Sequence, residues 1–325
     1  MTPAPGERVG RPVARWAAWA GFMLGLALLA GAVWLVLARD PEALSDVWSR
    51  LRAAPFWAAA VIVLGPLVNW IIVSGCLWML LVRHGRVGWG EMNALVGSAW
   101  LLNHLPMRPG LIGRVGYHKI VNGIRVRDAI ESTVWSLVLA ALAGVMALAL
   151  AFAVAPEHGV GQVGLVLAGP VLVLAAIGMC VRVAGRTGSA LLLGALAARY
   201  ADLAVWAARY AVVFWLMGLE IAPVQIIVIT GVSQVAQLIP IAGGGLGVRE
   251  WMVAFAAGWF ADTSLPADHA GMREVFDAAL SADLINRAAE TLIVIPVGLI
   301  GSWVVARNLR RLRGAASPNA GEQLA

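Results

Sequence analysis

The chain has 325 residues, of which 61% are hydrophobic and 13% charged, with 15 tryptophans and a formal net charge of +6 at pH 7. This composition excludes an ordinary water-soluble domain and predicts one integral membrane domain. The basic charge requires no nucleic-acid partner, because arginines beside membrane spans orient the chain and contact anionic headgroups.

Long apolar runs predict the membrane spans, since a helix needs about 20 apolar residues to cross a hydrocarbon core of roughly 30 Å. The runs cover residues 17–38, 56–82, 132–155, 163–181, 203–219, 222–240 and 284–306. A shorter apolar piece at 251–261 predicts either a half-helix or an eighth crossing. We therefore expect an all-α polytopic membrane protein with about eight transmembrane helices.

Both chain ends are predicted to be cytoplasmic. Arg307, Arg310, Arg311 and Arg313 directly follow the last run, and such clusters favour the cytoplasmic side. The first run is too long for the core of a signal peptide and is expected to stay as an anchor. The domains are then a cytoplasmic tail at 1–16, a transmembrane domain at 17–306 and a basic cytoplasmic tail at 307–325 with a disordered end. The expected location is the cell (inner) membrane.

The segment between the first two runs has a helical pattern. Leu44, Val47, Trp48 and Leu51 recur at helical spacing, with charged residues on the other faces. This pattern indicates either a helix lying on the outer membrane surface or an ordinary solvated connector.

Catalytic and metal-binding motifs are missing from the sequence. The two cysteines lie in apolar runs, the five histidines form no HExxH pair, and there is no GxxxxGK[ST] loop or GxSxG elbow. We therefore expect no metal, no cofactor and no enzymatic activity, and the chain is not its own ATP motor.

Two apolar stretches are interrupted in the same way, at 105–114 (LPMRPGLIGR) and at 239–250 (IPIAGGGLGVRE). In each, a proline ends the apolar run, glycines follow, and an arginine comes shortly afterwards. Proline removes a backbone donor and glycine permits close approach, so each break frees polar groups that lipid cannot satisfy. Paired interruptions in two halves of a chain point to a transporter's binding site. We expect two broken or re-entrant helical elements, related as an internal repeat, that meet around a polar cavity.

The breaks and the polar helix faces supply the candidate site. Arg114 and Arg249 each follow a break, where a new helix could aim its amide groups at an anion. The predicted substrate-binding residues are Asn103, Arg108, Arg114, Gly243, Gly244, Gly245, Arg249, Glu250 and Arg287. The predicted supporting network consists of Arg199, Asp202, Arg209, Gln234, Gln237, Asp283 and Glu290.

The supporting residues fall on helix faces. Asp283, Arg287 and Glu290 are spaced i, i+4 and i+7, which places them on one face of the last span. Charges inside a membrane need compensating partners. These stripes therefore indicate either a functional site or internal ion pairs, such as Asp202 with Arg199 or Arg209, and Arg287 with Asp283 or Glu290.

The break motifs resemble the flippase-like membrane domain of lysylphosphatidylglycerol synthases and of its stand-alone relatives. PIAGGGLGVRE at 240–250 is similar to the family's second motif. Asn103, Leu105, Pro106, Arg108, Gly110 and Arg114 are similar to its first, and Arg287 fits an arginine of the last family helix. The chain departs from the pattern at Leu111, where relatives often carry glutamate. No aminoacyl-transfer domain follows the last span, so synthesis of an aminoacyl lipid is not expected.

The resemblance implies that residues 17–306 form a lipid flippase or scramblase-like transporter. The expected substrate is a phosphate-bearing lipid, either a phospholipid or a polyprenyl-phosphate-linked one, with a lipid-synthesising enzyme as a candidate partner. The alternatives are a secondary transporter for a small anionic solute, coupled to protons through Glu250, Asp283 or Glu290, and an intramembrane lipid-modifying transferase with an acidic base. A scaffold subunit for another enzyme is a further alternative.

Overall fold

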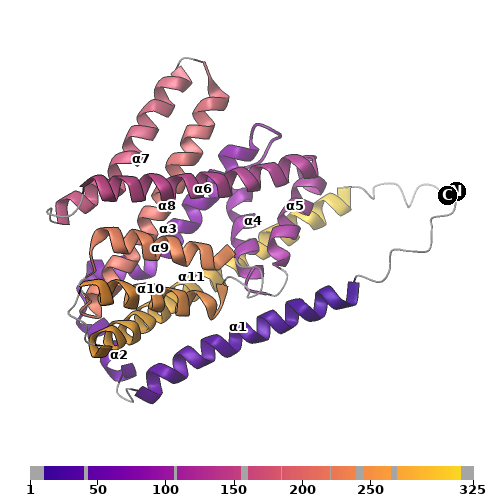
Figure 1. Ribbon diagram of the computed structural model, residues 1–325. Helices are drawn as coiled ribbons and strands as arrows, with labels where there is room; N and C mark the ends of the chain where they lie inside the picture. Colours follow the sequence, from indigo (N-terminus) through magenta and orange to yellow (C-terminus); the bar gives the residue numbers. More distant parts are fainter. Residues whose placement is uncertain are drawn as a thin grey trace, which may run out of the picture.

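A computed structural model of the chain describes residues 11–39, 43–105, 108–154, 160–183, 185–219, 221–238, 245–264 and 269–315. These residues form eleven α-helices and no strand (Figure 1). The helices are α1 (Arg11–Arg39), α2 (Ala43–Ala53), α3 (Phe56–Leu81), α4 (Trp89–Leu102), α5 (Pro109–Val121), α6 (Val126–Val154), α7 (Val160–Val183), α8 (Thr187–Leu216), α9 (Pro223–Leu238), α10 (Val248–Ser264) and α11 (His269–Ala315).

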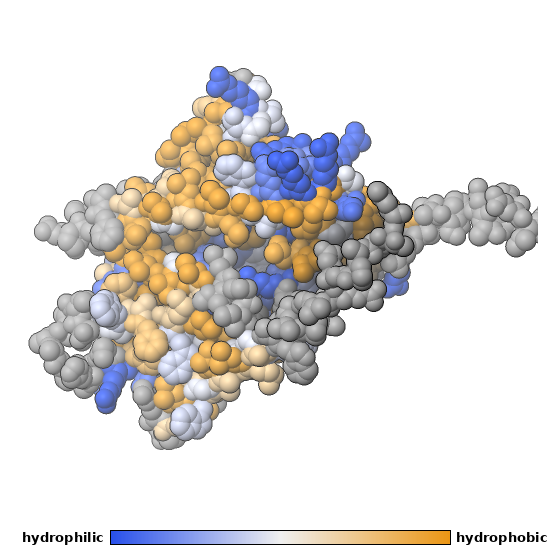
Figure 2. All heavy atoms as spheres, turned by 45° about the vertical axis from the view of Figure 1, so that its right-hand side comes forward, coloured by the Kyte–Doolittle hydropathy of each residue, from blue (hydrophilic) through white to orange (hydrophobic). Residues whose placement is uncertain are grey.

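Five of these helices are long and apolar enough to cross a membrane. The candidate spans are Trp19–Ala38, Phe56–Leu81, Val126–Leu150, Thr187–Leu216 and Arg273–Leu312, and Pro170–Val183 and Pro223–Gln237 are shorter apolar helices. The face shown in Figure 2 is largely hydrophobic, with hydrophilic residues gathered in patches. The all-helical part of the sequence prediction is confirmed, and the apolar helices support a membrane protein.

Several helices extend beyond the apolar runs that predicted them. Helix α8 begins at Thr187, well before the run at 203, and α11 begins at His269, well before the run at 284. The extensions contain the charged residues Asp202 and Asp283. A charged residue interrupts an apolar run in the sequence, but both side chains are buried inside the protein. Helices α4 and α5 lie outside every predicted run. The connector at 43–53 is the helix α2, as one of its two interpretations required.

Helices α4 and α5 form an antiparallel hairpin with the first break at its tip. At its open end, Asn122 Nδ2 donates to the carbonyl of Arg86 (3.2 Å) and to Glu91 Oε1 (3.1 Å). Near the tip, a Cβ atom on Gly110 would overlap the Ala99 carbonyl oxygen and lie 2.7 Å from Ala99 Cα. Glycine is therefore required for the two helices to approach this closely.

Helices α9 and α10 form a second hairpin around the second break. The start of α9 and the end of α10 share one apolar cluster, in which Ile226 and Phe260 pack together with Ala257. At the other end, Gly245 (φ 73°) folds back onto α9, where an added Cβ would lie 3.1 Å from Gln237 Cα. Residues 239–244, including Pro240 of the second motif, lie outside the described residues, as does Pro106 of the first.

The tips of the two hairpins meet. The guanidinium of Arg108, which begins α5 in a left-handed conformation (φ 46°), donates to the main-chain carbonyl of Gln237 near the end of α9. In Figure 1 the α4–α5 and α9–α10 hairpins converge at the centre of the bundle. The two breaks, far apart in sequence, are therefore adjacent in space.

Helix α3 extends from the open end of one hairpin to the open end of the other. At its start, Trp57 stacks on Trp215 in the last turn of α8, the helix that precedes α9, with ring centroids 5.4 Å apart. Near its end, Trp78 Nε1 donates to the carbonyl of Val87, just before α4 (2.9 Å). The open ends of the two hairpins therefore lie at opposite ends of α3.

Candidate functional site

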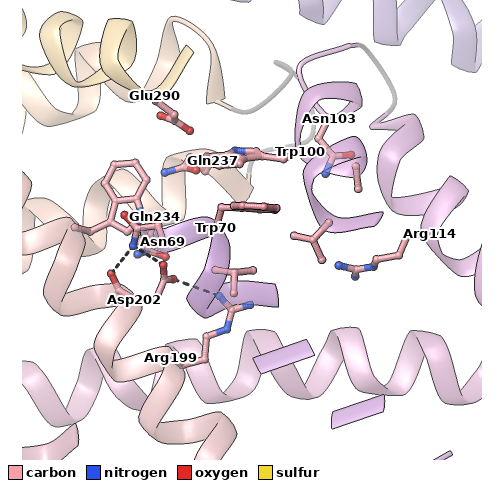
Figure 3. Close-up of a pocket in the computed structure, with 14 residues that line it drawn as sticks. Asn69, Trp70, Trp100, Asn103, Arg114, Arg199, Asp202, Gln234, Gln237 and Glu290 are labelled. Atoms are coloured by element: carbon pink, nitrogen blue, oxygen red, sulfur yellow. Dashed lines mark hydrogen bonds and ion pairs between the residues drawn. The ribbon is translucent and has the colours of Figure 1, made fainter. Parts of the chain in front are cut away.

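A cavity of about 220 Å³ lies where the hairpin tips meet (Figure 3). Helices α3, α4, α5, α8, α9 and α11 all contribute to its wall. The lining residues are Asn69, Trp70, Val73, Val96, Ala99, Trp100, Asn103, Arg114, Arg199, Asp202, Trp206, Gln234, Gln237 and Glu290. Seven of the sequence-predicted residues thus line one cavity: Asn103, Arg114, Arg199, Asp202, Gln234, Gln237 and Glu290.

Arg114 is the cation of this cavity that has no acidic partner among the residues that the structure describes. Its Nη2 atom donates to Thr133 Oγ1 of α6 (2.8 Å). Among the described residues, no carboxylate lies within ion-pairing distance of it. Figure 3 shows its guanidinium directed into the cavity, opposite that of Arg199, whose positive charge repels it. A bound anion would relieve this repulsion and satisfy donors that the protein leaves open.

Arg199, by contrast, forms an internal ion pair. Its Nη1 atom lies 3.3 Å from Asp202 Oδ2, and its Nε atom donates to Ser136 Oγ (3.0 Å). Asn69 Nδ2 donates to the other oxygen of Asp202 (2.6 Å) and to its carbonyl (2.9 Å). The pair is formally neutral, so the positive charge that the cavity offers a ligand comes from Arg114.

Asn103 stabilises the start of the helix that carries Arg114. Its side-chain oxygen accepts from the amide of Leu111 (3.1 Å) in the first turn of α5. This bond satisfies one of the amide groups that a helix start leaves open. Asn103 therefore contributes to the cavity wall and also fixes the start of α5, one turn before Arg114.

Arg249 is fully buried behind the cavity wall and is held by two carboxylates, of which Glu290 also lines the cavity. Its Nε atom lies 3.1 Å from Asp283 Oδ2 and its Nη1 atom 2.7 Å from Glu290 Oε2. The Tyr210 hydroxyl donates to the second Asp283 oxygen (2.7 Å) and forms another hydrogen bond with Ser233 (2.7 Å). These contacts join α8, α9, α10 and α11.

A second ion pair extends this buried network. Arg287 Nε lies 2.7 Å from Glu250 Oε1, and Arg287 Nη1 lies 3.9 Å from Glu290 Oε2. Glu290 therefore contacts both arginines, and it also lines the cavity. Through Glu290 the network reaches the site.

Arg209 completes the buried charges. Its Nη2 atom donates to the carbonyl of Asn286 (3.2 Å), and its guanidinium lies 4.4 Å from the ring of Trp206. The alkyl part packs against Gly65, where an added Cβ would lie 2.5 Å from Arg209 Cδ. Arg209, Arg249 and Arg287 thus face Glu250, Asp283 and Glu290, three formal charges of each sign.

The other predicted residues have different positions. Arg108 joins the hairpin tips, Gly245 packs against α9, and Gly243 and Gly244 lie outside the described residues. Sequence reasoning missed Asn69, Trp70, Trp100 and Trp206. A lone asparagine inside an apolar run was a usable signal for Asn69. The tryptophans gave none, because 15 are spread along the chain.

Comparisons of the chain with protein-family models, with curated proteins and with solved structures found no match. Within the described ranges, no group of three or more His, Cys, Asp or Glu side chains could hold a metal ion. The cavity can bind what its lining side chains recognise. It presents one unbalanced guanidinium, side-chain amides and indole rings, which suit a single anionic group.

Proposed function

We propose that the protein carries a phosphate-bearing lipid between the two leaflets of a membrane. The observation that carries this proposal is Arg114, which faces a polar cavity where two helical breaks meet and has no acidic partner among the described residues. A lipid phosphate is an anion whose oxygens match the guanidinium donors. The resemblance noted in the sequence supports the same substrate class.

The energetic requirement is to offset the desolvation of a charged headgroup. Each charge-assisted hydrogen bond contributes about 1.5 to 3 kcal/mol. Arg114 can supply more than one, and the amides of Gln234 and Gln237 add neutral donors on the opposite wall. The cavity can therefore lower the barrier that the hydrocarbon core presents to a phosphate.

The proposed membrane topology has six crossings and two re-entrant hairpins. Helices α1, α3, α6, α7, α8 and α11 would cross. Helix α4 has 14 residues, which extend about 21 Å and do not span a core of roughly 30 Å. Because their open ends lie at opposite ends of α3, the hairpins enter from opposite sides, as inverted repeats do.

The side that carries the open end of α4–α5 is proposed to be cytoplasmic. Arg83, Arg86, Arg125 and Arg127 flank that hairpin, and basic loops favour the cytoplasm. Six crossings then place both chain ends on this side. The start of α1 and the end of α11 point to the same side of the molecule in Figure 1, which supports this arrangement.

In this proposal Arg249, Glu250 and Arg287 position the site and do not bind the ligand directly. Their ion pairs connect the start of α10 to α11. Glu290 links these ion pairs to the cavity, because it contacts Arg249 and Arg287 and also lines the cavity wall. Arg114 is the proposed phosphate ligand.

The test uses purified protein in vesicles of phosphatidylethanolamine and phosphatidylglycerol that contain fluorescent phosphatidylglycerol. Dithionite bleaches only outward-facing label, so flipping appears as bleaching of the inner pool. Wild-type protein should make the inner pool accessible and Arg114→Ala should slow this strongly. Equal rates in wild type, Arg114→Ala and protein-free vesicles would refute the proposal. Uptake of inorganic phosphate without lipid movement would indicate the alternative, a small-anion transporter.

A further inference from the structure

A second, apolar groove begins beside Arg114. It has a volume of about 350 Å³ and lies between α4, α5 and α11. Its lining residues are Leu95, Ser98, Ala99, Leu102, Gly110, Gly113, Arg114, Gly116, Tyr117, Ile120, Val305 and Leu309. The hydroxyl of Ser98 already forms a hydrogen bond with that of Ser302 (2.9 Å), and the hydroxyl of Tyr117 accepts one from Asn308 Nδ2 (3.0 Å). Apart from these hydrogen-bonded groups, the lining side chains are apolar except that of Arg114.

The groove floor is made by glycines on one face of α5. Gly110, Gly113 and Gly116 recur every three residues and cover about 9 Å of helix. Gly110 is explained by its contact with α4, but a Cβ on Gly113 or Gly116 would meet nothing within 4 Å. Glycine destabilises a helix relative to alanine. Packing inside the described structure does not explain these two glycines, whereas a ligand against their bare backbone would.

Arg114 and Ala99 line both the groove and the polar cavity. One molecule can therefore touch both spaces if it has a phosphate at the guanidinium and a hydrocarbon tail attached to that phosphate. A free inorganic anion uses only the polar cavity. The two adjoining spaces differ in chemistry as the two ends of a lipid do.

We infer that the α4–α5–α11 groove holds one hydrocarbon chain of the lipid whose phosphate binds Arg114. This rests on the proposed function and adds a defined subsite to it. The hydrocarbon chain of the lipid lies against the backbone of α5 at Gly113 and Gly116. Leu102, Val305 and Leu309 form the facing walls. Specificity for the tail then resides in α5 and α11, separately from recognition of the headgroup.

Two variants test the groove. Gly113→Leu and Gly116→Leu each add a side chain to the groove wall from a Cβ position that meets no atom within 4 Å. Gly144→Leu is the matched control, since Gly144 is also helical with open space around its Cβ but lies on α6. Each protein is illuminated in the same vesicles with phosphatidylglycerol that carries a diazirine on one acyl chain, and crosslinked peptides are mapped by mass spectrometry.

Wild type and Gly144→Leu should crosslink within 95–102 and 305–309. Gly116→Leu should reduce this labelling about tenfold, because the added side chain takes the volume of several methylenes. Flipping by Gly116→Leu should fall in parallel, while its unfolding temperature should match that of Gly144→Leu. A wild-type protein that flips lipid but places no crosslink in the groove, or whose crosslinks and flipping survive in both groove variants, overturns the inference and leaves the proposed function intact. A wild type that flips nothing overturns the proposed function instead.

Discussion

Arg249 Nη1 lies 2.7 Å from Glu290 Oε2, so an arginine that the sequence motif assigns to a ligand is held by the protein's own carboxylate. Both side chains are almost completely shielded from solvent. Arg114, the other arginine that follows a break, has a threonine hydroxyl and an open cavity instead. The two arginines therefore occupy different environments, and their substitutions should behave differently.

The first prediction separates these arginines by stability. Arg249→Leu should destabilise the fold by about 3 to 5 kcal/mol, because Asp283 and Glu290 would remain buried without their cation. Arg114→Leu should change stability little, since no carboxylate partner is lost. Unfolding temperatures of the detergent-purified proteins, followed by tryptophan fluorescence, measure both. Equal shifts for the two variants would contradict the assignment.

The second prediction concerns the charge at residue 114. Arg114→Ala should slow lipid flipping by about ten- to a hundredfold, the effect of losing 1.5 to 3 kcal/mol of charge-assisted bonding. Arg114→Lys keeps the charge but not the planar donor pair, so its flipping rate should lie between those of the wild type and Arg114→Ala. Arg310→Ala, on the exposed end of α11, is the control and should flip at the wild-type rate. An inactive Arg114→Lys together with an active Arg114→Ala would be incompatible with phosphate binding here.

The third prediction uses the contact between Gly65 and Arg209. Gly65→Ala places a Cβ 2.5 Å from Arg209 Cδ and 2.7 Å from Arg209 Cγ, so the buried guanidinium must move. We expect a loss of about 1 to 3 kcal/mol in the free energy of unfolding, as for other overpacked cores. Gly90→Ala, whose Cβ would meet nothing within 4 Å, should be neutral or stabilising. Thermal unfolding of the pair decides the matter, and a Gly65→Ala protein as stable as Gly90→Ala would rule out the tight fit.

The fourth prediction compares two glycines on α5. Gly110→Ala should force α5 away from α4, because the new methyl would overlap main-chain atoms of Ala99 that cannot turn aside. Both stability and flipping should therefore decline. Gly113→Ala should fold at least as well as wild type, since its Cβ site is open. Size-exclusion chromatography and unfolding temperature provide the measurement, and similar behaviour of both variants would argue against the close α4–α5 contact.

The fifth prediction addresses topology. In a background where Cys76 and Cys180 are replaced by alanine, cysteines introduced at Arg86 and Arg125 should react with a membrane-impermeant maleimide from the same side. A cysteine at Arg52 should react only from the opposite side. Labelling of right-side-out and inside-out vesicles distinguishes the two. Reaction of positions 86 and 125 from different sides would show that α4 and α5 together cross the membrane.

The sequence predicted the helical class and the importance of the two breaks, because proline, glycine and arginine leave a readable pattern there. Seven of the predicted residues line the cavity: five came from polar spacing along helices, and Asn103 and Arg114 came from the first break and its motif. The sequence left open whether each break lies in a broken crossing helix or in a re-entrant element, so it did not establish that α4 and α5 fold back on each other. That depends on contacts between distant residues, such as Asn122 with Glu91, which hydropathy does not encode.

Pairing inside the charge network was also beyond a pattern argument. The stripe of Asp283, Arg287 and Glu290 suggested partners on one helix face, yet the closest ion pair of each of the three is with a residue of α10. Helical spacing shows which residues share a face. It does not show which residue of another helix occupies the space opposite, and here those neighbours pair with Arg249, whereas Arg114 lines the cavity.

The six buried charges of Arg209, Arg249, Arg287, Glu250, Asp283 and Glu290 sum to zero. A voltage across the bilayer acts on net charge at about 2.3 kcal/mol per elementary charge per 100 mV, so it performs no net work when this group shifts as a unit. In the proposed transport, charge movement would then come from groups outside this network, among them Arg114 and the cargo. Current recordings with neutral and charged headgroups would therefore read out the valence of whatever is carried.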